Sequence, residues 1–288
     1  MKKVTLRAYA KLNLGLNLLP EKTTSGYYKV YFINTQLKLS DRVKIKKLPT
    51  KNDIIVLSDE IEGKSNLAYE AAKTIKERYN LAEGIEIKIK KNIPIKAGLG
   101  GGSSDAASVI NGMIEIFALN IDNGEKLQLA KHLGMDVCYC TIGGLCEVKG
   151  IGDEVYPLQI RTPRLNILLI IPANTKPSTG WAYARVREED LGRNIDKINK
   201  LIEALKEGSI YNIAKYIHND FERVMIREFP FLNDIKEAML KYGALNASLA
   251  GSGLSIYGIF ETKKLMKAAA IPFRKRGFRV ICTETLNI

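Results

Sequence analysis

The feature that most constrains the fold is a glycine-rich segment lying between a strand pattern and a helix pattern. Residues 94–107 read PIKAGLGGGSSDAA. Four glycines fall within five positions: Gly98, Gly100, Gly101 and Gly102. Glycine adopts positive φ at no steric cost, so the backbone N–H groups of such a turn can surround an anion. Ser103 and Ser104 are able to cap a following helix, whose positive N-terminal end attracts phosphate. The segment therefore predicts a phosphate-binding turn.

Both flanks of the turn support a strand, turn and helix in that order. Residues 84–95 (GIEIKIKKNIPI) alternate apolar and basic side chains, as a half-buried strand does. Apolar residues after the turn recur at helical spacing: Ala106, Ala107, Val109, Ile110, Met113, Ile114 and Phe117. The alternative of a flexible surface turn does not account for this order.

Two familiar glycine motifs do not fit the segment. A P-loop requires lysine directly after its last glycine, but Gly102 is followed by Ser103. The dinucleotide motif, begun at Gly98, requires a third glycine where Ser103 stands. The turn therefore belongs to another class of phosphate-binding loop.

The turn resembles the phosphate-binding signature of the GHMP small-molecule kinases, and further motifs of that family follow in the expected order. These are Ala10-Lys11-Leu12-Asn13-Leu14, Asn66-Leu67, Gly134-Met135-Asp136-Val137, Gly150-Ile151-Gly152-Asp153-Glu154, Ser178-Thr179 and Ala250-Gly251-Ser252-Gly253. Each short match is weak, but their shared order makes coincidence improbable. The resemblance implies ATP and Mg²⁺ as cofactors and a small-molecule alcohol as the phosphoryl acceptor.

Strand and helix patterns are mixed rather than strictly alternating, which predicts an α+β fold. Strands are expected near residues 3–8, 29–37, 43–47, 54–57, 85–90, 145–149, 165–171, 247–250, 255–260 and 279–283. Helices are expected near 67–79, 104–117, 125–133, 195–206, 210–217, 231–241 and 263–276. The resemblance implies a ribosomal-protein-S5-like N-terminal domain (1–161), a ferredoxin-like C-terminal domain (162–288) and an active site between them.

A kinase must neutralise charge on the transferred phosphoryl group and accept or relay the proton of the alcohol. By resemblance, Asp136 is the base or orienting acceptor, and Lys11 keeps it ionised while stabilising developing negative charge. Without the family context, Asp136 reads as an ordinary helix-end or turn carboxylate.

The resemblance also assigns the nucleotide side of the site. The amides of the four glycines and the hydroxyl of Ser103 or Ser104 hold the β- and γ-phosphates, and Ser104 is the candidate Mg²⁺ ligand. Lys96 adds positive charge. Asn66 lies near the adenine, although a plain helix cap explains this residue equally well.

The expected substrate residues are Asn13, Tyr27, Tyr28, Thr179 and Ser252. At Tyr28 the chain departs from the family, which has a histidine there that helps to recognise a cytosine ring; a phenol lacks the paired nitrogens of imidazole. Residues 137–140 (VCYC) likewise replace the family's VPFF beside the expected base. Tyr27 can stack on a base, but both tyrosines also fit a strand core. Ser252 either closes over phosphate or simply lies in a turn.

Cysteine, histidine and overall composition argue against other classes of site. Cys138, Cys140, Cys146 and Cys282 lack the spacing of a zinc site and read as buried reduced thiols. The two histidines are too few and too scattered for a catalytic triad. No apolar run approaches about 18 residues and the N-terminus lacks a signal sequence, so we expect a cytoplasmic protein with no membrane partner.

Three hypotheses about function follow. The first is phosphorylation of a diphosphocytidyl sugar alcohol by a monomer or homodimer. The second is a related kinase whose cytidine pocket has been exchanged for another phosphorylated or sugar-like alcohol. The third, from another class, is an RNA-binding protein, because the chain has a net charge of +13. Basic residues are scattered along the sequence without a nucleic-acid-binding module, so we expect solvated faces and no nucleic-acid partner.

Overall fold

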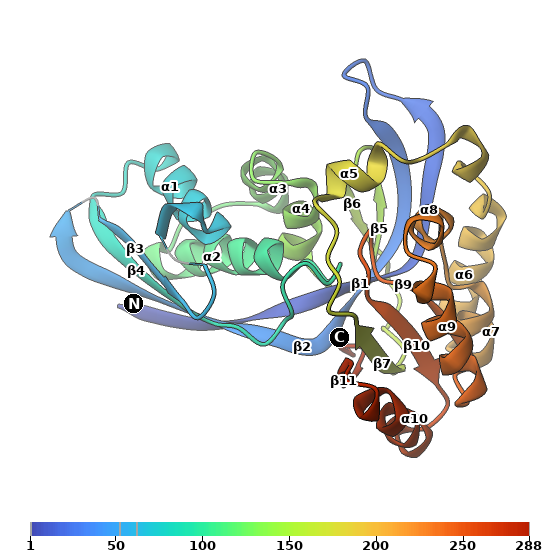
Figure 1. Ribbon diagram of the computed structural model, residues 1–288. Helices are drawn as coiled ribbons and strands as arrows, with labels where there is room; N and C mark the ends of the chain where they lie inside the picture. The colour runs from blue at the N-terminus through green and yellow to red at the C-terminus, as the bar shows by residue number, and fades with distance from the viewer. Residues whose placement is uncertain (1, 52, 62, 288) are drawn as a thin grey trace.

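The computed structural model describes residues 2–51, 53–61 and 63–287, which form two sheets (Figure 1). The first sheet has the strand order β3-β4-β2-β1-β8, with β5 paired to β2 and β6 paired to β5. Its strands are β1 (Lys3–Lys22), β2 (Tyr28–Lys51), β3 (Ile54–Ser58), β4 (Glu83–Lys90), β5 (Cys146–Lys149), β6 (Glu154–Pro157) and β8 (His218–Asn219). The second sheet has the order β11-β7-β10-β9. Its strands are β7 (Asn166–Ile171), β9 (Asn246–Leu249), β10 (Ile256–Phe260) and β11 (Arg279–Glu284).

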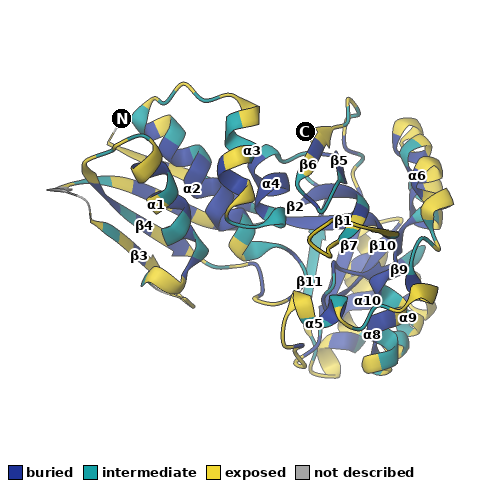
Figure 2. Cartoon of the chain, turned by 90° about the horizontal axis from the view of Figure 1, so that it is seen from above, coloured by how far each residue is buried: buried dark blue, intermediate teal, exposed yellow. Residues whose placement is uncertain are grey.

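Helices cover one face of each sheet. Beside the first sheet lie α1 (Leu67–Arg78), α2 (Gly101–Phe117), α3 (Asn123–Lys131) and α4 (Met135–Ile142). The second half contributes α5 (Thr179–Tyr183), α6 (Ile195–Glu207), α7 (Ile210–Tyr216), α8 (Phe221–Glu228), α9 (Phe231–Lys241) and α10 (Lys263–Lys275). Two single 3₁₀ turns, Gly63–Ser65 and Glu188–Asp190, complete the described elements. Figure 2 shows that helices at the surface, such as α6 and α9, have an exposed side and a buried side, whereas α4 has no exposed residue.

The long strands β1 and β2 connect the two parts of the molecule. The first residues of β1 alternate between exposed and buried, but every residue from Ala10 to Leu18 is buried. This central segment has no exposed face because its side chains enter both core clusters: Ala10, Leu12 and Leu14 join the cluster that contains residues of α6, β7 and β10, and Leu16 and Leu18 join the other. A register shift between Tyr9 and Lys11 marks the change, since an irregularity of this kind redirects the following side chains.

The predicted α+β class is confirmed, with three corrections to its elements. The segments 3–8, 29–37 and 43–47 are parts of two long strands and not short separate ones. Three short helices, α4, α5 and α8, and two short strands, β6 and β8, were not predicted. The helix after the glycine turn begins at Gly101 with Gly100 as its N-cap, so Ser103 and Ser104 lie inside the helix and do not cap it.

The division at residues 161 and 162 stays a proposal. Strands β1–β6 and the four strands of the second sheet fall on opposite sides of it, whereas β8 from the second half pairs with β1 through Gly15 and Leu16. Within the described residues, no helix is both long and apolar enough to cross a membrane.

Candidate functional site

Two cavities meet in the middle of the molecule. The first, about 430 Å³, is lined by the glycine turn, the start of α1 and the turn around Ser252. The second, about 770 Å³, is lined by the β1–β2 hairpin, the start of α4 and α5. The residues that line both are Phe32, Ser103, Asp136, Thr179 and Tyr183. Asp136 therefore lies at the junction of the two cavities.

The glycine turn is shaped around Lys11. Gly98 and Gly100 have φ values of +76° and +65°, which residues with a side chain rarely adopt. A Cβ on Gly100 would lie 2.7 Å from Cγ of Lys11, so the missing side chain leaves room for the lysine to pass. The amide of Lys11 donates to the carbonyl of Leu99 at 2.9 Å, which fixes β1 to the turn.

A second glycine turn, residues 250–253, packs directly on the first. A Cβ on Gly98 would lie 2.0 Å from the carbonyl oxygen of Ala250, and one on Gly253 would lie 2.9 Å from Cα of Gly98. The buried amide of Asn219 supports this second turn by donating to the carbonyls of Leu249 and Gly251, at 2.8 and 2.7 Å. The two halves of the chain thus build the first cavity together.

Ser252 lines this first cavity and not the second. It thus lies on the side of the glycine turn and apart from Tyr27 and Tyr28, with which it was expected to bind substrate.

Lys11 and Asp136 lie together, as the resemblance implied. Nζ of Lys11 is 3.3 Å from Oδ1 of Asp136; the lysine side chain is 6% exposed and the aspartate side chain 46%. Lys11 also donates to Oδ1 of Asn13 at 3.0 Å, and the Asn13 amide donates to Oδ1 of Asn34 at 2.6 Å. Asn13 lines neither cavity, whereas Asn34 lines the second. Asn13 thus positions Lys11 and does not face the second cavity. Its hydrogen-bond partner Asn34 does face that cavity, although the sequence did not indicate Asn34.

Asp136 lies in the first turn of α4. Negative charge is favoured at a helix N-terminus, where unpaired N–H groups give a partial positive charge. The N-cap residue, Gly134, has φ +147° and so allows the sharp entry into the helix. The short helix thus presents an accessible carboxylate at the junction of the cavities.

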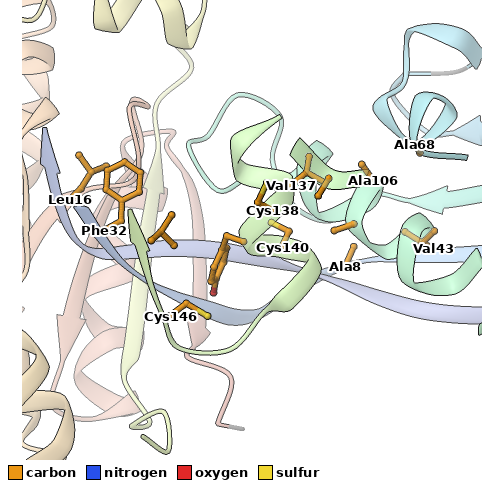
Figure 3. Close-up of a cluster of buried hydrophobic side chains, with 14 of the residues drawn as sticks. Ala8, Leu16, Phe32, Val43, Ala68, Ala106, Val137, Cys138, Cys140 and Cys146 are labelled. Carbon is orange, nitrogen blue, oxygen red and sulfur yellow. The ribbon is translucent and has the colours of Figure 1, made fainter. Parts of the chain in front are cut away.

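The cysteines around Asp136 belong to the core. Cys138, Cys140 and Cys146 are free and buried among apolar side chains (Figure 3). Burial raises the pKa of the Cys138 thiol to about 11, so this thiol stays protonated near neutral pH. Within the described part of the chain, no three His, Cys, Asp or Glu residues are grouped to hold a metal. Of the segment 137–140, only Tyr139 lines a cavity, so the replaced motif changes that wall at one position.

A buried ion cluster lies under the glycine turn. Lys91 donates to Oδ2 of Asp41 at 2.5 Å and to Oδ2 of Asp105 at 2.6 Å. Desolvation, reinforced by the charge of Asp41, raises the pKa of Asp105 to about 7 against the opposing effect of Lys91. Lys91 and Asp105 both line the first cavity. No sequence motif marks this cluster, because its members come from β2, from the segment after β4 and from α2.

The remaining nucleotide-side candidates occupy different positions. Lys96 is exposed and lines the first cavity, as does Asn66. The Asn66 side chain accepts from the amide of Ala68 at 3.0 Å and donates to the carbonyl of Ile61 at 2.7 Å, so its present role is a helix cap. Ser104 is buried, donates to the carbonyl of Tyr9 at 2.7 Å and lines neither cavity. The burial of Ser104 therefore does not favour the Mg²⁺ contact expected of it, whereas Ser103 lines both cavities.

Aromatic side chains and one lysine form the far end of the second cavity. Tyr27 and Tyr28 both line it, and Tyr27 is 64% exposed. Nζ of Lys22 lies 4.4 Å from the centroid of the Tyr28 ring. At the opposite end, the junction with the first cavity, lies Tyr183, which the sequence did not indicate and which is held edge-on by Phe221 with ring centroids 4.9 Å apart. The cavity therefore offers a carboxylate at one end and aromatic rings with a cation at the other.

Taken together, a glycine cradle for phosphate, a lysine and an accessible carboxylate between two cavities define a phosphotransferase site. Residues 66–144 match the GHMP kinases N terminal domain family, and residues 201–276 match the GHMP kinases C terminal family. The chain belongs to the GHMP kinase family and is an ATP-dependent phosphotransferase that acts on an alcohol group. It is 37% identical to a 4-diphosphocytidyl-2-C-methyl-D-erythritol kinase from Acetivibrio thermocellus, over 99% of this chain and 100% of the relative.

Solved structures agree with this assignment. A crystal structure of 4-(cytidine 5'-diphospho)-2C-methyl-D-erythritol kinase superposes with a TM-score of 0.83 at 28% identity, covering 98% of this chain and 99% of the other. Homoserine kinase from Cytophaga hutchinsonii superposes with a TM-score of 0.79 at 16% identity, covering 100% and 95%. The second likeness concerns the fold alone. The predicted two-domain kinase fold is thereby confirmed.

Proposed function

We propose that the protein transfers the γ-phosphoryl group of ATP to the 2-hydroxyl of 4-diphosphocytidyl-2-C-methyl-D-erythritol, in the non-mevalonate route to isoprenoids. The observation that carries this proposal is the position of Asp136 at the junction between the cavity lined by the glycine turn and the cavity lined by Tyr27 and Tyr28. The curated relative named above, similar over the full length, supports the same substrate.

In this proposal the first cavity holds ATP. The amides of residues 98–102 surround the β- and γ-phosphates, and the N-terminus of α2 adds its partial positive charge. Lys96 and Ser252, which both line this cavity, contact the nucleotide. The Lys11 ammonium stabilises negative charge that develops on the transferred group.

The acceptor alcohol occupies the second cavity. Asp136 orients its hydroxyl and takes the proton as the oxygen attacks, while Thr179 lies at the same junction. Tyr27 provides a ring surface for the cytosine at the far end, whereas Asn34 and Tyr183, the latter lining both cavities, face the sugar-alcohol portion.

Mg²⁺ belongs to the proposal as a cofactor that arrives with ATP. Mg²⁺ usually keeps several waters and binds through substrate phosphates and one or two protein oxygens, so a preformed protein cage is not required. The oxygens of Ser103 and Asp136 at the junction fit such a partial shell, as does Oδ1 of Asp105, a buried atom with no hydrogen-bond partner. When bound, Mg²⁺ supplies charge neutralisation of the phosphates.

A second candidate function is phosphorylation of another phosphorylated or sugar-like alcohol on the same scaffold. The observation that favours it is Tyr28, covered on one side by Lys22, at the position where the family has a histidine. The two candidates are separated by measuring ATP consumption with purified protein, Mg²⁺ and a panel of isoprenoid-precursor and sugar alcohols. If only the diphosphocytidyl substrate is phosphorylated, the first candidate function is supported. If that substrate is left unchanged while another alcohol is phosphorylated, the first candidate is overturned in favour of the second.

A further inference from the structure

Basic residues that are scattered in the sequence gather on one face of the first sheet. Three aligned cross-strand rows on β1, β2 and β4 make up what we call the basic sheet face: Arg7, Arg42 and Lys90; Thr5, Lys44 and Lys88; Lys3, Lys46 and Glu86. Seven of these nine positions carry a cation and one carries a carboxylate. The face therefore holds a net charge of +6 (seven minus one), out of +13 for the whole chain.

This concentration of cations on one face differs from the scatter of basic residues along the sequence. All seven cationic side chains are exposed. The alternate residues of the same strands, such as Val43, Ile45 and Ile87, point the other way into the core. Figure 1 shows α1 and α2 on that inner side of the sheet and no described helix on the outer side.

The arrangement is electrostatically unfavourable by itself. Lys44 lies directly opposite Lys88, and Arg42 lies opposite both Arg7 and Lys90. Like charges directly opposite one another across strands destabilise a sheet. Within this face, the described residues form one ion pair, between Lys88 and Glu86 at 3.4 Å. A polyanion bound to the face would relieve this repulsion.

The face is separate from the kinase site, because none of its nine residues lines either cavity. Its charge therefore does not serve to hold ATP or the acceptor.

We propose that the basic sheet face is a docking surface for duplex nucleic acid, bound through its phosphate backbone without sequence recognition. Cations recur at about 6.8 Å along each strand and about 4.8 Å between strands, which gives a dense array able to neutralise several phosphates at once. The nine positions include no aromatic residue, whereas proteins that bind single strands stack bases on aromatic side chains. The next strand, β3, adds two exposed aliphatic side chains beside these rows, Ile55 next to Glu86 and Leu57 next to Lys88. Apolar side chains thus border the cationic rows at the β3 edge, whereas an interfacial membrane anchor inserts apolar side chains from its whole binding face.

The first experiment measures binding of full-length protein to a labelled DNA or RNA duplex by fluorescence anisotropy over a range of salt concentrations. If the face engages five to seven phosphates, the logarithm of affinity falls with the logarithm of salt concentration with a slope of about −4 to −6. An undetectable interaction at low salt overturns the proposal.

A pair of triple variants then locates the binding surface. Lys44→Gln, Lys46→Gln and Lys88→Gln together should reduce the slope by about 3 and weaken binding at least about tenfold near physiological salt. The control replaces three exposed lysines of α10, Lys264, Lys267 and Lys275, and changes the net charge equally. Equal losses in both variants would mean non-specific attraction by the whole protein and would overturn the proposal.

Two further measurements complete the test. Turnover of the kinase should be unchanged in both triple variants, because neither set lines a cavity. Vesicles that contain anionic phospholipid serve as the competing polyanion. Retention on such vesicles that depends on Lys44, Lys46 and Lys88, with no binding of either duplex, would assign the face to a membrane surface instead and overturn the proposal. Because turnover is measured separately, failure of this proposal leaves the proposed kinase function untouched.

Discussion

The ammonium of Lys11 lies 3.3 Å from Oδ1 of Asp136, although one residue belongs to the first strand and the other to the fourth helix. The lysine is almost fully buried, whereas nearly half of the aspartate side chain is accessible from the cavities. This asymmetry suits a pair in which the lysine is fixed by Asn13 and the aspartate meets the substrate.

Replacement of Asp136 by asparagine tests the catalytic role of the pair. Asparagine keeps the shape but cannot take a proton, so kcat should fall by about a thousandfold. ATP should still bind, because the glycine turn is unchanged. The matched control is Asp153→Asn, a carboxylate paired with Lys131 outside both cavities. Wild-type turnover by Asp136→Asn would remove this residue from the mechanism.

Substitution of Gly98 by alanine tests the contact between the two glycine turns. The new Cβ would lie 2.0 Å from the Ala250 carbonyl oxygen, and φ is +76°. We expect a loss of about 2 kcal/mol or more in the free energy of unfolding, together with weaker ATP binding. Gly102→Ala is the control for folding, since its Cβ meets no atom within 4 Å and its φ is not positive. Equal stability of the two variants, measured by denaturant unfolding, would contradict the packing described.

Tyr27 offers the clearest test of the substrate cavity. Its ring is 64% exposed, so Tyr27→Ala should leave stability unchanged. If the ring stacks on the cytosine, the loss of about 1–3 kcal/mol should raise KM for the alcohol roughly five- to a hundredfold while KM for ATP stays constant. Tyr211→Ala, at a tyrosine 56% exposed and outside both cavities, is the matched control. An unaltered KM in Tyr27→Ala would exclude stacking there.

Introduction of histidine at Tyr28 tests recognition at the position that departs from the family. The imidazole titrates near pH 6.5, so Tyr28→His should make KM for the diphosphocytidyl substrate pH-dependent about that value. The same change at Tyr156, which is exposed and lines neither cavity, should have no such effect. A pH profile of Tyr28→His identical to that of the wild type would place residue 28 away from the bound base.

His218 should make folding stability sensitive to pH. It is buried, its Nδ1 contacts the Tyr216 carbonyl, and desolvation lowers its pKa from 6.5 to about 4. The unfolded chain therefore binds a proton that the folded chain refuses, so stability is complete above pH 6.5 and falls as the pH decreases toward 4. The difference of 2.5 units corresponds to a loss of about 3 kcal/mol.

Denaturant unfolding across this pH range measures the effect, and His218→Gln should flatten the dependence. The carboxylate of Glu284 contributes to folding stability over a separate, lower range of pH. Its cation partners, first of them Arg164, lower its pKa from 4.5 to about 2. Its stabilisation is present above pH 4.5 and is lost as the pH falls toward 2. Stability that is constant between pH 6.5 and 4 in the wild type would contradict the burial of a neutral His218.

The sequence predicted the parts of the fold that depend on local periodicity. The strand, glycine turn and helix between residues 84 and 117 are correct because alternation and helical spacing are properties of short segments. The single long strand β1 was not predicted because its central residues are buried on both faces and carry no alternation. The short helices α4 and α5 are too brief to show a helical period.

The candidate site divides in the same way. Lys11, Asp136 and the glycines belong to short motifs and were found as such. Asn34, Tyr183 and Lys91 reach the cavities only through tertiary packing, so no motif marks them. Ser103 and Ser104 are successive residues of α2, so their side chains point about 100° apart and only one of them can face the cavity, and the sequence motif did not indicate which one.

The packing of residues 250–253 against Gly98 limits how this enzyme can be divided or recombined. The nucleotide cradle takes its shape from backbone atoms contributed by both halves of the chain. A fragment that ends before the second glycine turn should therefore fail to retain ATP even if it folds. Hybrids that exchange halves between relatives should be functional only where both turns keep glycine at the touching positions. The nucleotide site is in this sense a property of the assembled chain and not a portable module.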